Sequence, residues 1–150
     1  MKQEVPAWLA VLFPVAFLCM WFLVSFLLSR FGWAQLAERF RSDRPIPDGA
    51  SRFLWQSMSV GLKLGSPSYS NCINVWIDDH ALYLRPSLPF RTFHPLLRIY
   101  WRDVVSLAPR KMFIFKFVEL RPKHGAPSLV FSGRAGRAIT EKWQSIGGGS

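Results

Sequence analysis

The chain has 150 residues, half of them apolar, and a net charge of +10 from 19 lysines and arginines against nine acids. Its 13 phenylalanines and seven tryptophans exclude a disordered tail, and its length leaves room for one folded domain beside a membrane segment. Cys19 and Cys72 are too few for a disulfide framework, and we expect both to be free thiols in a reducing compartment.

Residues 7–29 form an uncharged apolar stretch that predicts a transmembrane helix. The stretch holds six leucines, four phenylalanines and three valines, and no charged residue lies between Glu4 and Arg30. As a helix it is about 34 Å long, enough to cross a hydrocarbon core of about 30 Å. A cleaved signal peptide is the alternative, but its apolar region has about 7 to 15 residues and a small-residue cleavage site. No such site follows Leu28, so we expect the span to be retained.

The basic residues on the two flanks of this span predict its orientation. Lys2 precedes the span, whereas four arginines follow it closely, namely Arg30, Arg39, Arg41 and Arg44. Because basic flanks stay in the cytoplasm, we expect residues 1–6 outside and the rest of the chain in the cytoplasm, at a bacterial inner membrane. Trp8 and Trp33 lie near the two ends and are predicted to be membrane anchors, each with its indole N–H in the headgroup layer.

Residues 30–41 keep helical spacing beyond the span, with apolar side chains at i, i+3, i+4 and i+7 from Trp33 to Phe40. This stripe predicts a short amphipathic juxtamembrane helix with two possible placements. It lies along the headgroups, or it packs on the folded domain and sets the angle of that domain to the membrane. Residues 42–51 are rich in proline, aspartate and glycine, which predicts a linker.

From residue 52 to residue 146 the pattern indicates one mainly antiparallel β domain. Apolar residues alternate with small or polar ones, which is the period of a half-buried strand. Strands are predicted at residues 58–64, 72–77, 80–85, 97–101, 104–107, 111–120 and 128–132. The strand at 111–120 is apolar on both faces. We therefore expect both faces to be covered, one by the core and the other by a helix, the membrane or a partner.

A helix is predicted from Ser132 or Gly133 to Ser145, with Ala135, Ile139 and Trp143 on one side. The predicted fold class is an N-terminal transmembrane helix followed by an antiparallel β roll or barrel of about seven strands, closed by this C-terminal helix. Residues 147–150, Gly-Gly-Gly-Ser, are typical of an appended flexible linker and are left out of the fold.

Two stretches carry a resemblance to a known family. Residues 75–86, VWIDDHALYLRP, and residues 97–107, LRIYWRDVVSL, resemble strands of pleckstrin-homology-like and GRAM-like domains, in particular bacterial membrane-anchored versions. The resemblance implies such a domain over residues 52–146 and a membrane-tethered protein-binding or scaffold role. Phosphoinositide-binding members share a Lys-x-Arg arrangement on the first hairpin. Here Lys63 is followed by an uncharged loop, residues 65–71, so specific inositol phosphate recognition is not implied.

Residues 85–111 are the predicted contact surface, because they hold six basic residues against the single acid Asp103. The predicted lipid or partner contacts are Arg85, Phe90, Arg91, Phe93, His94, Arg98, Arg102, Arg110 and Lys111. Aromatic residues interleaved with arginine suit an anionic lipid surface, a protein partner or single-stranded nucleic acid. The tether favours lipid over nucleic acid. A solvated loop whose phenylalanines fill the core is the remaining alternative.

Patterns for catalysis or metal binding are weak in this chain. The histidines at 80, 94 and 124 are far apart, lack a second ligand at i+3 or i+4, and are expected on the surface. Asp78 and Asp79 fit a tight turn better than a shared proton, and Cys72 fits a buried strand. GRAGR at residues 133–137 lacks the lysine and the spacing of a phosphate loop.

We therefore expect a single-pass inner-membrane protein without enzymatic activity, catalytic residues, metal or cofactor. Its basic cytoplasmic domain is predicted to act as an adaptor or accessory subunit that contacts anionic lipid or another protein. An alternative is a structural subunit of a larger membrane complex, with the transmembrane helix as its main interface. A small membrane-bound hydrolase is the third interpretation.

Overall fold

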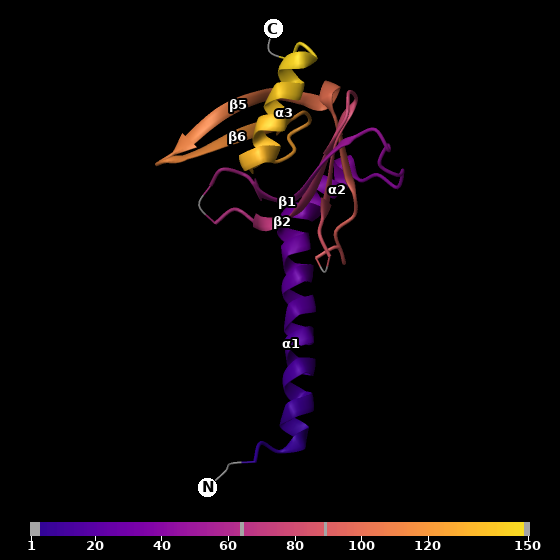
Figure 1. The fold of residues 1–150 in the computed structure, drawn as a ribbon, viewed down its shortest axis with the longest axis vertical. Coiled ribbons are helices and arrows are strands. Elements are labelled where there is room, and N and C mark those ends of the chain that lie inside the picture. The colour runs from indigo at the N-terminus through magenta and orange to yellow at the C-terminus, as the bar shows by residue number, and fades with distance from the viewer. Residues whose placement is uncertain (1–3, 64, 89, 149–150) are drawn as a thin grey trace.

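A computed structural model describes residues 4–63, 65–88 and 90–148 of the chain. Its first part is a continuous helix made of α1 (Ala7–Leu28), a π-helical turn η1 (Ser29–Trp33) and α2 (Ala34–Phe40). α1 projects from the rest of the protein as a stalk. The N-terminus of the chain lies at the free end of this stalk, and the C-terminus lies at the opposite pole of the molecule (Figure 1). By length and composition the 34-residue helix could cross a membrane.

The end of this helix belongs to the core of the domain. Trp33 and Leu36 are fully buried and Phe40 is 6% exposed, in the same apolar cluster as the strands. Gly32 permits the close approach, because a Cβ atom at this position would lie 3.1 Å from Pro67 Cβ. Of the two placements predicted for the amphipathic stripe, packing on the domain is therefore the one observed.

The prediction that Trp33 anchors the helix in a headgroup layer is wrong. Its side chain is enclosed by the domain, and its indole N–H donates a 2.9 Å hydrogen bond to the carbonyl oxygen of Pro95. A buried indole N–H needs an acceptor, and this carbonyl supplies it. Trp8 keeps an outward position, with 63% of its surface exposed.

Seven antiparallel strands form one curled sheet, a half-barrel, in the order β4-β3-β2-β1-β7-β6-β5. The strands are β1 (Ser51–Val60), β2 (Ser68–Ile77), β3 (Ala81–Pro86), β4 (Leu97–Tyr100), β5 (Val104–Met112), β6 (Phe115–Pro122) and β7 (Leu129–Ser132). A 3₁₀ turn, η2 (Trp101–Asp103), separates β4 from β5. The expected seven-stranded antiparallel sheet with a C-terminal helix is confirmed.

The sheet curls at β1, which pairs with β2 on one side and with β7 on the other. Its register shifts twice around Gln56, and Trp55 has a φ of +56°. Bulges of this kind increase local twist and re-aim side chains. Gln56 is thereby turned inward, where its Oε1 accepts a 3.1 Å hydrogen bond from the Ala135 N–H in the first turn of the C-terminal helix.

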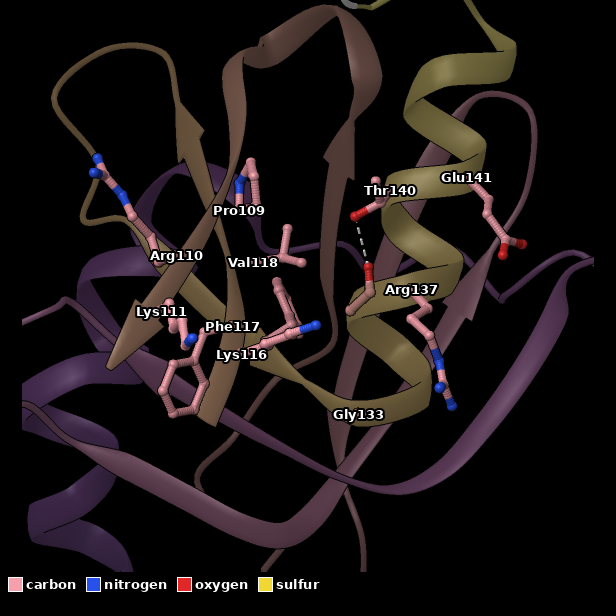
Figure 2. Close-up of a pocket in the computed structure, with 12 residues that line it drawn as sticks. Pro109, Arg110, Lys111, Lys116, Phe117, Val118, Gly133, Arg137, Thr140 and Glu141 are labelled. Atoms are coloured by element: carbon pink, nitrogen blue, oxygen red, sulfur yellow. Dashed lines mark hydrogen bonds between the residues drawn. The ribbon is translucent and has the colours of Figure 1, made fainter. Parts of the chain in front are cut away.

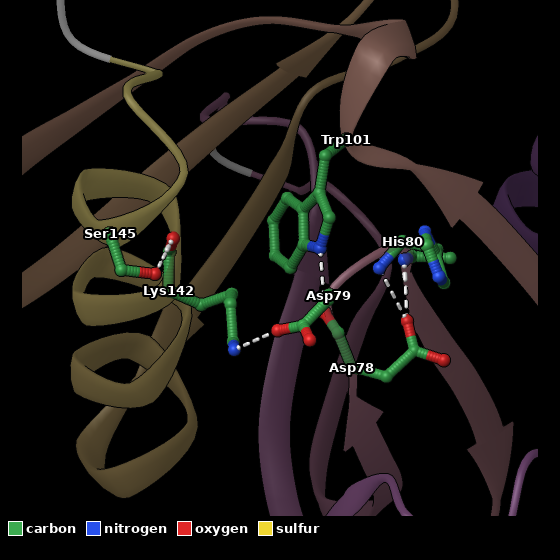
Figure 3. A network of polar contacts seen from close by, with 7 residues as sticks. Asp78, Asp79, His80, Trp101, Lys142 and Ser145 are labelled. Atoms are coloured by element: carbon green, nitrogen blue, oxygen red, sulfur yellow. Dashed lines mark hydrogen bonds and ion pairs between the residues drawn. The ribbon is translucent and has the colours of Figure 1, made fainter.

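The C-terminal helix, α3 (Gly133–Ser145), packs against β1, β2, β6 and β7 and buries Ala135 and Ile139. Its far end is tied to the turn between β2 and β3, where Lys142 Nζ lies 2.7 Å from Asp79 Oδ1 (Figure 3). In the same turn, Asp78 accepts hydrogen bonds from the His80 and Ala81 N–H groups and from the Tyr83 hydroxyl. Its backbone carbonyl accepts one from the indole of Trp101.

Residues 111–120 do not form the single strand predicted for them. β5 ends at Met112, Phe113 and Ile114 make a two-residue turn, and β6 starts at Phe115. Phe113 and Ile114 are 87% and 83% exposed, so no helix among the described residues covers this part of the hairpin, and cover by the membrane or a partner stays a prediction. The four residues from Met112 to Phe115 are all apolar and include no glycine, proline, asparagine or aspartate, which is why the sequence gives no sign of the reversal.

Because Leu36 is completely enclosed, the variant Leu36→Ala should lower the free energy of unfolding of the domain by about 2 to 5 kcal/mol. Chemical denaturation of the full chain in detergent measures the change. The matched control is Phe31→Ala on the same helix, where the side chain is 69% exposed and the cost should stay below about 1 kcal/mol. Equal costs for the two variants would mean that α2 does not belong to the cooperative core.

Candidate functional site

The structure divides the predicted contact residues among three places. Arg85, Phe90, Arg91, Phe93 and His94 lie in or beside the loop between β3 and β4, which contacts α1. Arg98 and Arg102 line a cleft with the chain that follows α2, and Arg110 and Lys111 lie on the β5–β6 hairpin. The prediction of one continuous basic surface over residues 85–111 is therefore wrong, because β4 and η2 turn the chain away from the loop.

We call the described residues of the β3–β4 connection, 87, 88 and 90–95, the helix-docked loop. The ring of Phe90 lies 4.8 Å from the ring of Trp21, and the ring of Phe93 lies 5.5 Å from that of Phe26, edge to face. Both partners are on α1, inside the apolar stretch. The loop thus lies along the last turns of that helix while Phe93 stays 50% exposed and Leu88 66% exposed.

His94 holds this loop from within and is not a surface residue as predicted. It is 4% exposed, and its ring packs edge to face against Trp33 and Tyr69 at 5.4 Å and 5.8 Å. Because a carbonyl only accepts, the 2.9 Å contact with the Thr92 oxygen assigns the proton to Nδ1. Nε2 then faces the Tyr69 hydroxyl at 3.5 Å. Burial lowers the pKa of His94 below its ordinary value, so the neutral ring fits this place.

Two arginines place positive charge at this surface, Arg91 in the helix-docked loop and Arg85 beside it in β3. Arg85 lies near the end of β3 and is half-buried, and burial and the neighbouring charge of Arg91 lower its pKa. The Nε atom of Arg91 is buried and has no hydrogen-bond partner among the described residues. The loop therefore combines exposed apolar side chains with two adjacent cations, and one of these has an unused donor.

The β5–β6 hairpin and α3 enclose the second surface, which we call the hairpin groove (Figure 2). The groove has a volume of about 680 Å³, with Val118 and Phe131 at its floor and Lys111, Lys116 and Arg137 at its rim. Arg110 is held by Glu119, whose carboxylate also accepts from Arg121, with N···O distances of 2.8 Å and 3.2 Å. Burial opposes ionisation of Glu119, but these arginines outweigh it and lower its pKa.

The tip of the hairpin projects sideways beyond the domain (Figure 1). Its apolar side chains are all exposed, namely Met112, Phe113, Ile114 and Phe115. Phe113 also has a φ of +55°, a left-handed backbone that costs a residue other than glycine roughly 1 to 2 kcal/mol. A hairpin turn that is both strained and apolar indicates that these side chains serve something other than the fold.

The described residues contain no group of three or more His, Cys, Asp or Glu side chains placed to hold a metal ion. His80 and His124 are exposed and lie apart from His94. Cys72 is 8% exposed, and burial raises the pKa of its thiol, which keeps it protonated and unreactive.

Comparison with known proteins gives little to assign. No protein-family model matches the chain, and no curated protein matches it. Among solved structures it is similar to the C-terminal domain of an unknown protein from Leishmania infantum. The similarity has 16% sequence identity and a TM-score of 0.41, and it covers 62% of this chain and 85% of that one.

Sequence reasoning missed the residues that hold the helix-docked loop. Trp21 and Phe26 lie in the apolar stretch, where their types give no sign of a tertiary contact. Tyr69 lies in a segment assigned to a turn-rich break, although β2 starts at Ser68. The one available signal was Trp21 itself, because a tryptophan in the middle of a predicted membrane span lies away from the interface that this residue type prefers.

Acidification should loosen the helix-docked loop. Since the pKa of His94 lies below the ordinary value of 6.5, the unfolded chain binds more protons than the folded one below pH 6.5. The stability is complete above that pH and is lost as the pH falls through the folded pKa. The thermal unfolding midpoint of the full chain should therefore fall between pH 7.5 and pH 5.5. The variant His94→Gln should flatten this profile, whereas His124→Gln should keep it. Parallel profiles for all three proteins would contradict the assignment.

Proposed function

We propose that the protein is a single-pass membrane-anchored adaptor or accessory subunit without enzymatic activity. α1 crosses the membrane, the domain lies on its cytoplasmic side, and the helix-docked loop rests on anionic lipid. The arginines at 30, 39, 41 and 44 support this orientation. The resemblance of residues 75–107 to pleckstrin-homology-like domains supports a binding role over a catalytic one.

The contact of the helix-docked loop with α1 is the observation that carries this proposal. Trp21 lies seven residues before Leu28, which is about 10 Å along the helix axis. If α1 spans the bilayer to Leu28, Phe90 is held about that far below the edge of the hydrocarbon. Apolar groups of interfacial segments insert about 5 to 10 Å. The long side chains of Arg85 and Arg91 can extend from there toward the headgroups, where each cation gains about 1 kcal/mol from anionic lipid.

The hairpin groove supports the second half of the proposal, a protein partner. The β5–β6 hairpin and α3, which line this groove, lie on the part of the domain away from the N-terminal end of α1 (Figure 1). Among the residues that line the groove, Glu141 is the acid, whereas Lys111, Lys116 and Arg137 are basic. A rim of this charge around exposed apolar side chains suits a partner segment that combines acidic residues with apolar anchors.

A structural subunit with α1 as its main interface is the alternative function. The specific observation in its favour is the exposure of large apolar side chains along α1, such as Phe13 at 74% and Val11 at 65%. Lipid covers such a surface as well as another helix does. Close helix packing in membranes favours small residues, and this helix offers few beyond Ala7, Ala10 and Ala16.

The lipid contact is tested with the full chain in nanodiscs of anionic or zwitterionic lipid. A fluorophore attached at Leu88→Cys, in a background without the two native cysteines, should be quenched by lipids labelled near the glycerol level. The same fluorophore at Asp48→Cys in the linker should not be. The double variant Arg85→Glu with Arg91→Glu should reduce the quenching in anionic discs. At high salt the quenching in this variant and in the chain with both arginines should become similar, because surface charges are then screened.

The matched control carries the same change of charge on α3, at the exposed residues Arg134→Glu and Arg137→Glu. It should leave the quenching at position 88 unchanged. If the fluorophore at Leu88→Cys is as exposed to water as the one at Asp48→Cys, the loop does not rest on lipid and the proposal fails.

The partner contact is tested by a photocrosslinker at Ile114 of the full chain in its native membranes. We expect one discrete adduct whose contact peptide is acidic, and the pair Lys111→Glu with Lys116→Glu should abolish it. Arg52→Glu with Arg134→Glu, on other surfaces, should keep it. Phe113→Asn should weaken the adduct without loss of stability, since asparagine tolerates a positive φ. If the adduct persists in the Lys111→Glu, Lys116→Glu double variant, or if the contact peptide is neutral, the partner is not acidic.

A further inference from the structure

The third basic surface is a cleft of about 420 Å³ between the chain that follows α2 and the β4–η2 segment. We call it the arginine cleft. Five arginines line it, namely Arg39, Arg41, Arg44, Arg98 and Arg102. Of these, the first three come from the flank of the apolar helix, and sequence alone explains them as a topology signal. Their meeting with two arginines from a distant part of the chain is a tertiary feature that topology does not require.

Backbone pairing brings the two groups of arginines together. Arg41 forms an antiparallel bridge with Leu97, and the Ser42 N–H donates a 3.0 Å hydrogen bond to the Leu96 carbonyl. The chain after α2 thus covers the free edge of β4. Arg98 closes the cleft from the strand side, because its guanidinium donates a 3.1 Å hydrogen bond to the Pro45 carbonyl.

Aromatic rings orient two of the guanidinium groups. Arg98 lies over the ring of Tyr83 at 5.0 Å, and Arg102 lies over the ring of Tyr100 at 4.8 Å. Tyr83 is itself fixed by the 2.8 Å hydrogen bond from its hydroxyl to Asp78. Stacking of this kind restricts a guanidinium to a plane and leaves its N–H edge free to bind a ligand. The cleft is therefore partly preorganised.

The charges of the cleft are not balanced from within. Asp43 and Asp103 are the acids among its lining residues, against the five arginines. Arg41 and Asp43 are 3.6 Å apart, but both side chains are largely exposed, so this ion pair neutralises little. Five positive charges against two negative ones among the lining residues leave an excess that an anion bound in the cleft would balance.

We propose that the arginine cleft binds a small soluble ligand that carries two or more phosphate groups. The planar fork of each guanidinium matches the oxygens of phosphate, and two or more forks around one cleft suit adjacent phosphates better than a single carboxylate. A volume of about 420 Å³ is within the range of sites for small ligands.

The position of the cleft favours a soluble ligand over a lipid headgroup. The helix continues 12 residues past Leu28 to Phe40, which is about 18 Å along its axis. The headgroup layer is only about 5 to 8 Å thick on each side of the bilayer. The cleft thus lies beyond the phosphates of ordinary lipids. This choice of source rests on the proposed span, whereas phosphate binding itself does not.

Calorimetric titration of the full chain in zwitterionic nanodiscs tests the proposal, with inorganic pyrophosphate as the probe. We expect saturable binding of one pyrophosphate per chain, weakened by salt. The pair Arg41→Gln with Arg102→Gln should lower the affinity about tenfold or more, since each loses a charged hydrogen bond. Arg102→Lys keeps the charge but loses the planar fork of the guanidinium. Its affinity for pyrophosphate should lie between that of the unmodified chain and that of the double variant.

The control pair, Arg52→Gln with Arg134→Gln, removes the same charge from exposed positions outside the cleft and should change the affinity by less than about twofold. Thermal unfolding shows that each variant is folded. Absence of saturable binding, or an equal loss in the control pair, would overturn the proposal. A second titration in anionic nanodiscs distinguishes the sources. Unchanged affinity supports a soluble ligand, whereas competition by lipid that disappears in the cleft variants assigns the cleft to headgroups instead.

Discussion

The enclosure of one tryptophan by three separate segments is the constraint on which the rest of this structure depends. Trp33 belongs to the helix, yet its indole N–H is bonded to Pro95 at the end of the helix-docked loop. Its ring packs on Tyr69 of β2 and on His94. A side chain with no exposed surface in this place joins helix, sheet and loop into one unit. The contact of Phe90 with Trp21 and the position of the arginine cleft both follow from it.

The curl of the sheet supplies the second constraint. β1 has two register shifts around Gln56, and the side chain that they turn inward meets the first turn of α3. Ser132 at the N-terminus of α3 makes no side-chain cap, so the Ala135 N–H depends on this distant glutamine. The β5–β6 hairpin is then left to extend past α3 with one side uncovered, which creates the hairpin groove.

The strands and the C-terminal helix could be predicted from the sequence because their apolar residues have a clear period, and the apolar helix because it is a long uncharged apolar stretch. The Phe113–Ile114 turn could not, since it contains none of the residue types that usually reverse a strand. The basic and aromatic residues of the candidate sites could be picked out by type, but they were wrongly expected to form one surface. Arg98 and Arg102 face Arg41 and not the loop, because of the bridge from Arg41 to Leu97, and such a tertiary pairing leaves no local pattern.

The way the helix enters the domain has a mechanical consequence. Flexible tethers let a domain tumble independently of its anchor, but here residues 42–51 come after α2, and the helix reaches the core without a break. Gly32 is packed against Pro67 at the junction, so it does not serve as a swivel. A rotation of α1 about its long axis therefore rotates the whole half-barrel with it.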